Sequence, residues 1–136
     1  YLCPACGKKV TVGVLHRVNR LADRSHGFRP DSAKPFFSLI PLVEVLAETI
    51  GTGVASKRVD AEYRRLISQL GNEFRILMDA ALPDIEKAGS PLTREAISRV
   101  RNGKVNIVPG FDGEYGKIRI FEAAERRQIK GQAALF

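Results

Sequence analysis

The sequence has two cysteines, two histidines, one methionine and no tryptophan among its 136 residues. The cysteines, Cys3 and Cys6, are too few and too close together to build the disulfide framework of a secreted protein. No apolar run approaches the roughly 18 residues that a membrane-spanning helix needs, and no stretch has the order of a signal peptide. We therefore expect a soluble, cytoplasmic protein with no membrane partner.

The motifs of several enzyme classes are also absent. The sequence contains no Walker A motif, no Gly-x-Ser-x-Gly and no histidine-rich cluster of the kind that a hydrolase needs. Asp112 and Glu114 form a candidate acid and base or metal pair, but carboxylates in a glycine-rich turn are usually solvated. We therefore expect no catalytic residue within this chain.

The charge favours an anionic partner. Lysine and arginine number 22 against 15 acidic residues, for a net charge of +7. The excess lies at the two ends, because residues 36–103 hold nine charges of each sign. Nucleic acid is the partner that such a balance most often serves, although charge alone does not prove it.

The chain divides by composition into three predicted segments. Residues 1–35 form a partial zinc-knuckle segment and a linker, since the stretch 25–35 is rich in turn formers. Residues 36–121 form a helical DNA-binding-type domain that ends in a β-hairpin, and residues 122–136 form a charged tail. Because the chain begins at a tyrosine inside a cysteine motif, we expect it to be part of a larger protein.

Within the first segment, alternating Val10, Val12 and Val14 predict a short strand, followed by a helix over 16–24. The central segment has apolar residues at helical spacing, which predicts helices around 42–50, 59–70 and 92–100, with a shorter one over 83–87. After residue 103 the period falls to two, which predicts a hairpin with a glycine-rich loop. The fold class expected is α+β and mainly helical.

The cysteine pair predicts half of a zinc site. Zinc takes four soft or borderline ligands, and a Cys-x-x-Cys turn followed by Gly and Lys commonly supplies two of them. A second pair upstream of Tyr1 would complete the site. His16 and His26 are an alternative pair of ligands, although their spacing matches no common zinc finger, and a further alternative is two reduced cysteines that bind no metal.

Two stretches have the order helix, glycine-bearing turn, helix start, as in helix-hairpin-helix units. Glycines let a backbone approach a phosphate, and the free amides at the second helix start donate to it. The predicted DNA-binding residues are Gly51, Gly53, Ser56, Lys57 and Arg58 in the first unit, and Gly89, Ser90 and Arg94 in the second. Ordinary helical hairpins are the alternative, since glycine is common in their turns.

Two further features concern recognition. Phe111 and Tyr115 lie in the glycine-rich loop, where an aromatic side chain could stack on a base. The last five residues, Gln-Ala-Ala-Leu-Phe, resemble the peptide that bacterial repair proteins insert into the sliding clamp, which makes Gln132, Leu135 and Phe136 candidate clamp-binding residues. The alternative is an apolar tail that packs on its own domain.

Four segments, 3–24, 40–42, 71–77 and 108–118, resemble in the same order the C-terminal half of the endonuclease Q family. The last of them reads Val-Pro-Gly-Phe-Asp-Gly-Glu-Tyr-Gly-Lys-Ile. The members are PHP-type nucleases that nick DNA on the 5′ side of deaminated bases and abasic sites. Some bacterial relatives are fused to a UvrD-type helicase or carry that label.

The resemblance implies that a PHP domain with the catalytic metals precedes this chain in the parent protein. It also implies that Cys3 and Cys6 are the second half of a zinc site. The chain itself would be a non-catalytic region that binds DNA and handles damage. The alternative is a protein-interaction module that links a nuclease or a UvrD-type helicase to the sliding clamp.

Overall fold

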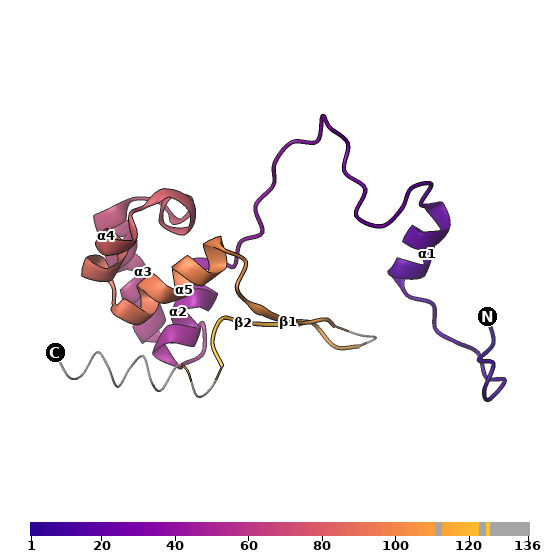
Figure 1. Cartoon of the computed structure of the whole chain (residues 1–136). Coiled ribbons are helices and arrows are strands. Elements are labelled where there is room, and N and C mark those ends of the chain that lie inside the picture. Colours follow the sequence, from indigo (N-terminus) through magenta and orange to yellow (C-terminus); the bar gives the residue numbers. More distant parts are fainter. Residues whose placement is uncertain (111–112, 123–124, 126–136) are drawn as a thin grey trace. The chain divides into compact units, whose positions relative to one another are not determined.

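A computed structural model of the chain describes residues 1–110, 113–122 and 125 (Figure 1). Its internal contacts define two compact units, Tyr1–Phe36 and Phe37–Phe136. The first unit holds the cysteines, and the second holds most of the regular structure. The predicted tail over 122–136 lies almost wholly outside the described residues.

The first unit contains one helix, α1 (Val14–Leu21), and a tight turn at the cysteines. The predicted strand at Val10, Val12 and Val14 is wrong: residues 10–13 have no regular structure, and Val14 begins the helix. The physical reason is that a strand needs a hydrogen-bonding partner, and pairing in this region stops at the single bridge between Leu2 and Lys9. The helix predicted over 16–24 begins and ends earlier than expected.

In the part of the chain that the structure describes, the second unit is built on four α-helices and a short π-helical turn. These are α2 (Leu42–Ile50), α3 (Lys57–Leu70), η1 (Arg75–Asp79), α4 (Leu82–Ala88) and α5 (Pro91–Arg101). Helix α2 packs on α3 and on α5, while α4 packs on α3 and on α5, so the four helices surround one core. Its fully buried side chains include Leu42, Leu46, Leu66, Ile76, Ile85 and Ile97.

Local signals in the sequence determine where these helices begin and end. The hydroxyl of Ser56 accepts the N–H of Val59 at 3.3 Å, and that of Ser90 accepts the N–H of Thr93 at 3.1 Å, so a serine caps each of α3 and α5. Gly51 ends α2 in the left-handed conformation, with φ at +83°, which glycine adopts without steric cost. The helices predicted for this region are confirmed, with small changes at their ends.

The turn η1 was not predicted. The side chain of Asn72 accepts the N–H of Arg75, the first residue of η1, at 2.9 Å. The guanidinium group of Arg101 in α5 donates to the carbonyl oxygens of Ile76, Leu77 and Ala80 at 2.7 to 3.0 Å. Two of these carbonyls lie within η1 and the third directly follows it, so a side chain more than twenty positions away satisfies them.

The C-terminal hairpin is confirmed. Strands β1 (Asn106–Val108) and β2 (Lys117–Arg119) pair antiparallel, with Ile107 opposite Ile118. Both strands are exposed along their whole length. Figure 1 shows the two strands extending from the cluster of helices. The chain returns to the core directly after β2, where Ile120 and Phe121 are buried.

No helix in the described part of the chain combines the length and the apolar character required to cross a lipid bilayer.

Candidate nucleic-acid interface

The first helix hairpin presents an exposed, basic helix start. The chain leaves α2 at Gly51 and enters α3 at Lys57, and both Lys57 and Arg58 are exposed. The side-chain hydroxyl of Ser56 accepts the N–H of Val59, and its backbone carbonyl oxygen accepts the N–H of Asp60. Among the described residues, the N–H groups of Lys57 and Arg58 have no acceptor, so both remain available to an anion at the positive end of the helix dipole.

The second helix hairpin offers fewer free donors. Pro91, the first residue of α5, has no N–H, and the side chain of Ser90 already accepts the N–H of Thr93. Arg94 lies 3.4 Å from Glu86, so its charge is partly neutralised. The close turn at Gly89 is a packing requirement: a Cβ there would lie 3.1 Å from the carbonyl oxygen of Ile85. The first hairpin therefore offers more free donors and more unpaired positive charge than the second, among the described residues.

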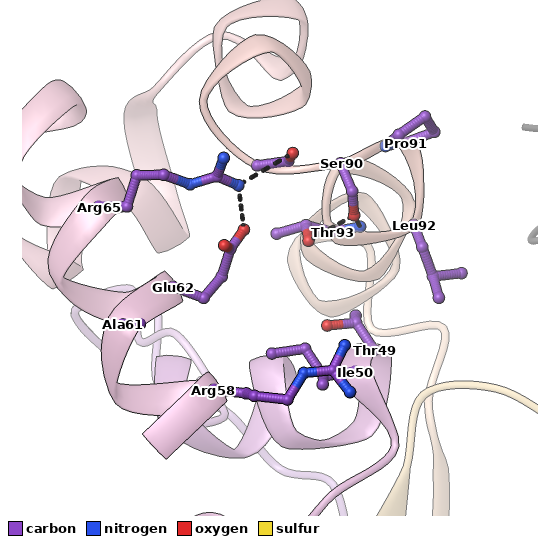
Figure 2. Close-up of a pocket in the computed structure, with 11 residues that line it drawn as sticks. Thr49, Ile50, Arg58, Ala61, Glu62, Arg65, Ser90, Pro91, Leu92 and Thr93 are labelled. Atoms are coloured by element: carbon purple, nitrogen blue, oxygen red, sulfur yellow. Dashed lines mark hydrogen bonds and ion pairs between the residues drawn. The ribbon is translucent and has the colours of Figure 1, made fainter. Parts of the chain in front are cut away.

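A groove of about 560 Å³ joins the two hairpins (Figure 2). It is bordered by the end of α2, one face of α3 and the start of α5. Of the predicted DNA-binding residues, Arg58, Gly89 and Ser90 line this groove. Gly51 and Gly53 line a separate groove beside β2, together with Ile118 and Ile120. The remaining three, Ser56, Lys57 and Arg94, line neither groove.

Sequence reasoning missed two charged residues of the groove. Glu62 and Arg65 lie 2.6 Å apart, and Arg65 also donates to the carbonyl oxygen of Gly89 at 3.2 Å. Arg58, Ala61 and Arg65 recur at helical spacing, which places them on one side of α3. That spacing was a usable signal, but the sequence does not show that the start of α5 faces it.

The hairpin loop and the chain end hold the remaining predicted contacts. The side chain of Tyr115 is 97% exposed. Phe111 and Asp112 lie outside the described residues, as do Gln132, Leu135 and Phe136 of the predicted clamp peptide. Base stacking and clamp binding therefore stay predictions, as does assignment of the two hairpins to the helix-hairpin-helix class.

The two cysteines lie in a tight, hydrogen-bonded turn. The N–H of Cys3 donates to Lys8 and its carbonyl oxygen accepts from Gly7, both at 2.8 Å, which closes a tight loop around the pair. Backbone N–H groups of Ala5 and Cys6, and the Cys6 side chain, lower the pKa of the Cys3 thiol. The shift favours the thiolate form of Cys3.

The histidines do not join the cysteines in the described residues. No group of three or more histidine, cysteine, aspartate or glutamate side chains gathers there at metal-binding distance. The ring of His16 instead contacts Tyr1 edge-on, with 4.6 Å between ring centroids. Zinc binding by Cys3 and Cys6 stays a prediction.

Comparisons with known proteins bear on most of the chain. Residues 41–104 match the family model described as MJ0043 C-terminal domain, which spans α2 to α5. The MJ0043 protein of Methanocaldococcus jannaschii is 40% identical over 119 residues, covering 85% of this chain and 14% of that protein. YqxK of Bacillus subtilis is 32% identical over 118 residues, covering 86% of this chain and 27% of that protein.

Two solved structures are similar to this chain in fold as well as in sequence. The lesion-specific endonuclease PfuEndoQ from Pyrococcus furiosus matches with a TM-score of 0.74 and 38% identity, covering 89% of this chain and 30% of that chain. The chain is similar to part of endonuclease Q. A second endonuclease Q structure, a complex with a 27-mer duplex substrate that has an abasic lesion at the active site, matches with a TM-score of 0.71 and 37% identity over the same shares.

The chain spans less than a third of the length of each of these proteins. The predicted resemblance to endonuclease Q is thereby supported for the sequence and the fold. The names of these four proteins do not mention a helicase. A helicase in the parent protein stays a prediction.

Proposed function

We propose that this chain is the DNA-binding, non-catalytic C-terminal region of a PHP-type repair endonuclease. In this proposal it holds the duplex while a catalytic domain outside these residues nicks on the 5′ side of a deaminated base. The observation that carries it is the 38% identity and TM-score of 0.74 with lesion-specific endonuclease Q over 89% of the chain.

The first helix hairpin supplies a physical basis for the DNA contact. Two N–H groups that have no acceptor among the described residues, the helix dipole and the side chains of Lys57 and Arg58 all favour a phosphate at the start of α3. Such contacts fix the position of a duplex without reading its sequence. A repair enzyme that must expose a damaged base needs this kind of grip on the flanking duplex.

In this proposal the parent protein has two separate metal sites. The catalytic metals belong to a PHP domain that precedes this chain in the parent protein. Zinc belongs to the cysteine turn, where Cys3 and Cys6 supply two ligands and a cysteine pair upstream supplies the other two. A structural zinc would stabilise the first unit, because binding free energy adds directly to folding free energy.

The test is a titration of the chain into labelled duplexes, with and without a single deoxyuridine or abasic site, at two salt concentrations. We expect binding in which log affinity falls in proportion to log salt, since phosphate contacts release counterions. Preference for the lesion would place part of damage recognition in this region. Absence of binding at low salt would contradict the proposal and favour the protein-interaction module.

A further inference from the structure

The groove between the two helix hairpins has three chemically different zones. At one end lies Arg58, which has no ion-pair partner among the described residues. In Figure 2 its guanidinium group points along the groove toward Thr49 and Ile50. This end therefore presents a full positive charge, and it attracts an anionic group.

The other end presents a donor and an acceptor together. The guanidinium of Arg65 donates to Glu62 at 2.6 Å and to the carbonyl oxygen of Gly89 at 3.2 Å. The pair is neutral overall, but each partner retains further hydrogen-bonding capacity, because a carboxylate accepts several bonds and a guanidinium has five N–H groups. A neutral ligand edge that carries both donors and acceptors suits this end, whereas a second phosphate would be repelled by Glu62.

The third zone is apolar. Its lining residues are Ala61, Pro91 and Leu92, with Ile50 beside Arg58. The hydroxyls of Ser90 and Thr93 border it and lie 2.9 Å from each other. Apolar walls of this kind favour a flat or apolar group over a hydrated ion, because burial removes apolar surface from water.

We propose that this groove binds a single unstacked nucleotide, with its phosphate on Arg58 and the edge of its base at the Glu62 and Arg65 pair. Arg58 and Arg65 are seven positions apart on α3, which is about 10 Å along the helix axis. That separation suits the span from a nucleotide's phosphate to the far edge of its base. The sugar and the base faces then lie against the apolar zone.

The inference rests on the proposed function only for the source of the nucleotide. An unpaired DNA strand is the source that fits a repair enzyme, since disturbed base pairing near a lesion releases nucleotides from the stack. A free nucleotide has the same chemistry. The direct experiment therefore uses mononucleotides first and an oligonucleotide second.

The probes are the four deoxynucleoside 5′-monophosphates, inorganic phosphate and a single-stranded oligodeoxynucleotide. Each is titrated into the isotope-labelled 136-residue chain, and backbone amide shifts are followed by NMR. We expect mononucleotides to shift the amides around Ala61 and Gly89. An equal response to inorganic phosphate would overturn the proposal, because it would leave only an anion site, and so would no response at these amides.

Two exposed positions provide matched variants. Ala61→Phe fills the groove without changing the charge, and Lys87→Ala removes one exposed charge from α4 without altering the groove lining. We expect A61F to weaken mononucleotide binding at least about tenfold, comparable to removal of one charge-assisted hydrogen bond. K87A should leave it unchanged. Equal effects of the two variants would overturn the nucleotide site, and circular dichroism checks that both remain folded.

The oligonucleotide and duplex arms separate the sources and the two proposals. Tighter binding of the single strand, sensitive to A61F, assigns the groove to an unpaired strand, whereas mononucleotide binding alone assigns it to a free nucleotide. If A61F still binds the duplex and no mononucleotide binds, this inference is wrong. The proposed function is then unaffected. Mononucleotide binding without duplex binding would support this inference and contradict the proposed function.

Discussion

The carboxylate of Glu48 accepts the backbone N–H of Ile120 at 2.9 Å, and the same oxygen accepts the N–H of Phe121 at 2.9 Å. Glu48 lies in α2, and the other two residues follow β2. This side chain therefore attaches the end of the hairpin to the helical core, together with Arg99 of α5, which donates to the carbonyl oxygen of Ile120 at 3.2 Å. Because both strands are exposed, and two-stranded hairpins are marginal on their own, this attachment supports the hairpin as a whole.

Replacing Glu48 by alanine is expected to loosen the hairpin. The variant leaves two backbone N–H groups without an acceptor at a site where Ile120 and Phe121 are buried, which costs about 1–3 kcal/mol of unfolding free energy. Hydrogen exchange should accelerate at these two amides more than in α3. Glu44→Ala is the control, since Glu44 is exposed on the same helix. Equal protection in the two variants would contradict the attachment.

Replacing Arg101 by lysine is expected to destabilise the second unit by about 2–4 kcal/mol, because an ammonium group cannot reach three carbonyls in the geometry of a guanidinium fork. Burial lowers the pKa of Arg101, in line with its enclosed position. Urea unfolding measures the change. Arg64→Lys is the control, since Arg64 forms an exposed ion pair with Asp60 and should cost less than about 1 kcal/mol. Similar costs for both would refute the role given to Arg101.

The double variant Lys57→Ala, Arg58→Ala tests the start of α3. We expect weaker duplex binding regardless of sequence, and a salt dependence that is shallower by about two units of slope, roughly one for each phosphate that is no longer neutralised. Fluorescence anisotropy at several salt concentrations measures both. Lys87→Ala is the control, because Lys87 lies in α4 beside a different groove. An unchanged slope would make the first hairpin purely structural.

The cysteine turn predicts a difference in thiol reactivity. Hydrogen bonds from backbone N–H groups lower the pKa of Cys3, so its thiolate should form at a lower pH than an ordinary cysteine thiolate. Below the ordinary thiol pKa, Cys3 should therefore be alkylated faster than in the unfolded chain, and the advantage should fall as the pH rises toward that value. Mass spectrometry of iodoacetamide labelling across a pH series, with a urea-unfolded sample as the reference, measures this. Identical pH profiles in the two samples would contradict the hydrogen-bonded turn.

The Cys3 prediction also bears on zinc. If the upstream part of the parent protein supplies two further ligands, the chain alone should hold little zinc, and a longer chain that includes that part should hold about one ion. Metal content by mass spectrometry under native conditions checks this. Full occupancy in the 136-residue chain as a monomer would assign the remaining ligands to this chain instead.

The sequence was a good guide to the helices of the second unit because their limits depend on neighbouring residues. Ser56 and Ser90 cap helices through contacts three residues away, and Gly51 ends a helix through its own backbone conformation. It was a poor guide to Val10, Val12 and Val14, whose alternation suggests a strand, because a strand also depends on a distant partner. The turn η1 was missed for the same reason, because its carbonyl oxygens are hydrogen-bonded by Arg101, which is far away in the sequence.

For the candidate site, the sequence by itself determined the residue types: basic residues at a capped helix start, glycine-bearing turns and a cysteine pair. These follow from local hydrogen bonding, backbone freedom and charge. Only the tertiary structure decided that Arg58 shares a groove with Gly89 and Ser90, and that Glu48 holds Ile120. Such contacts join residues far apart in the chain, and they arise from the packing of α2 to α5 around one core, which no local pattern specifies.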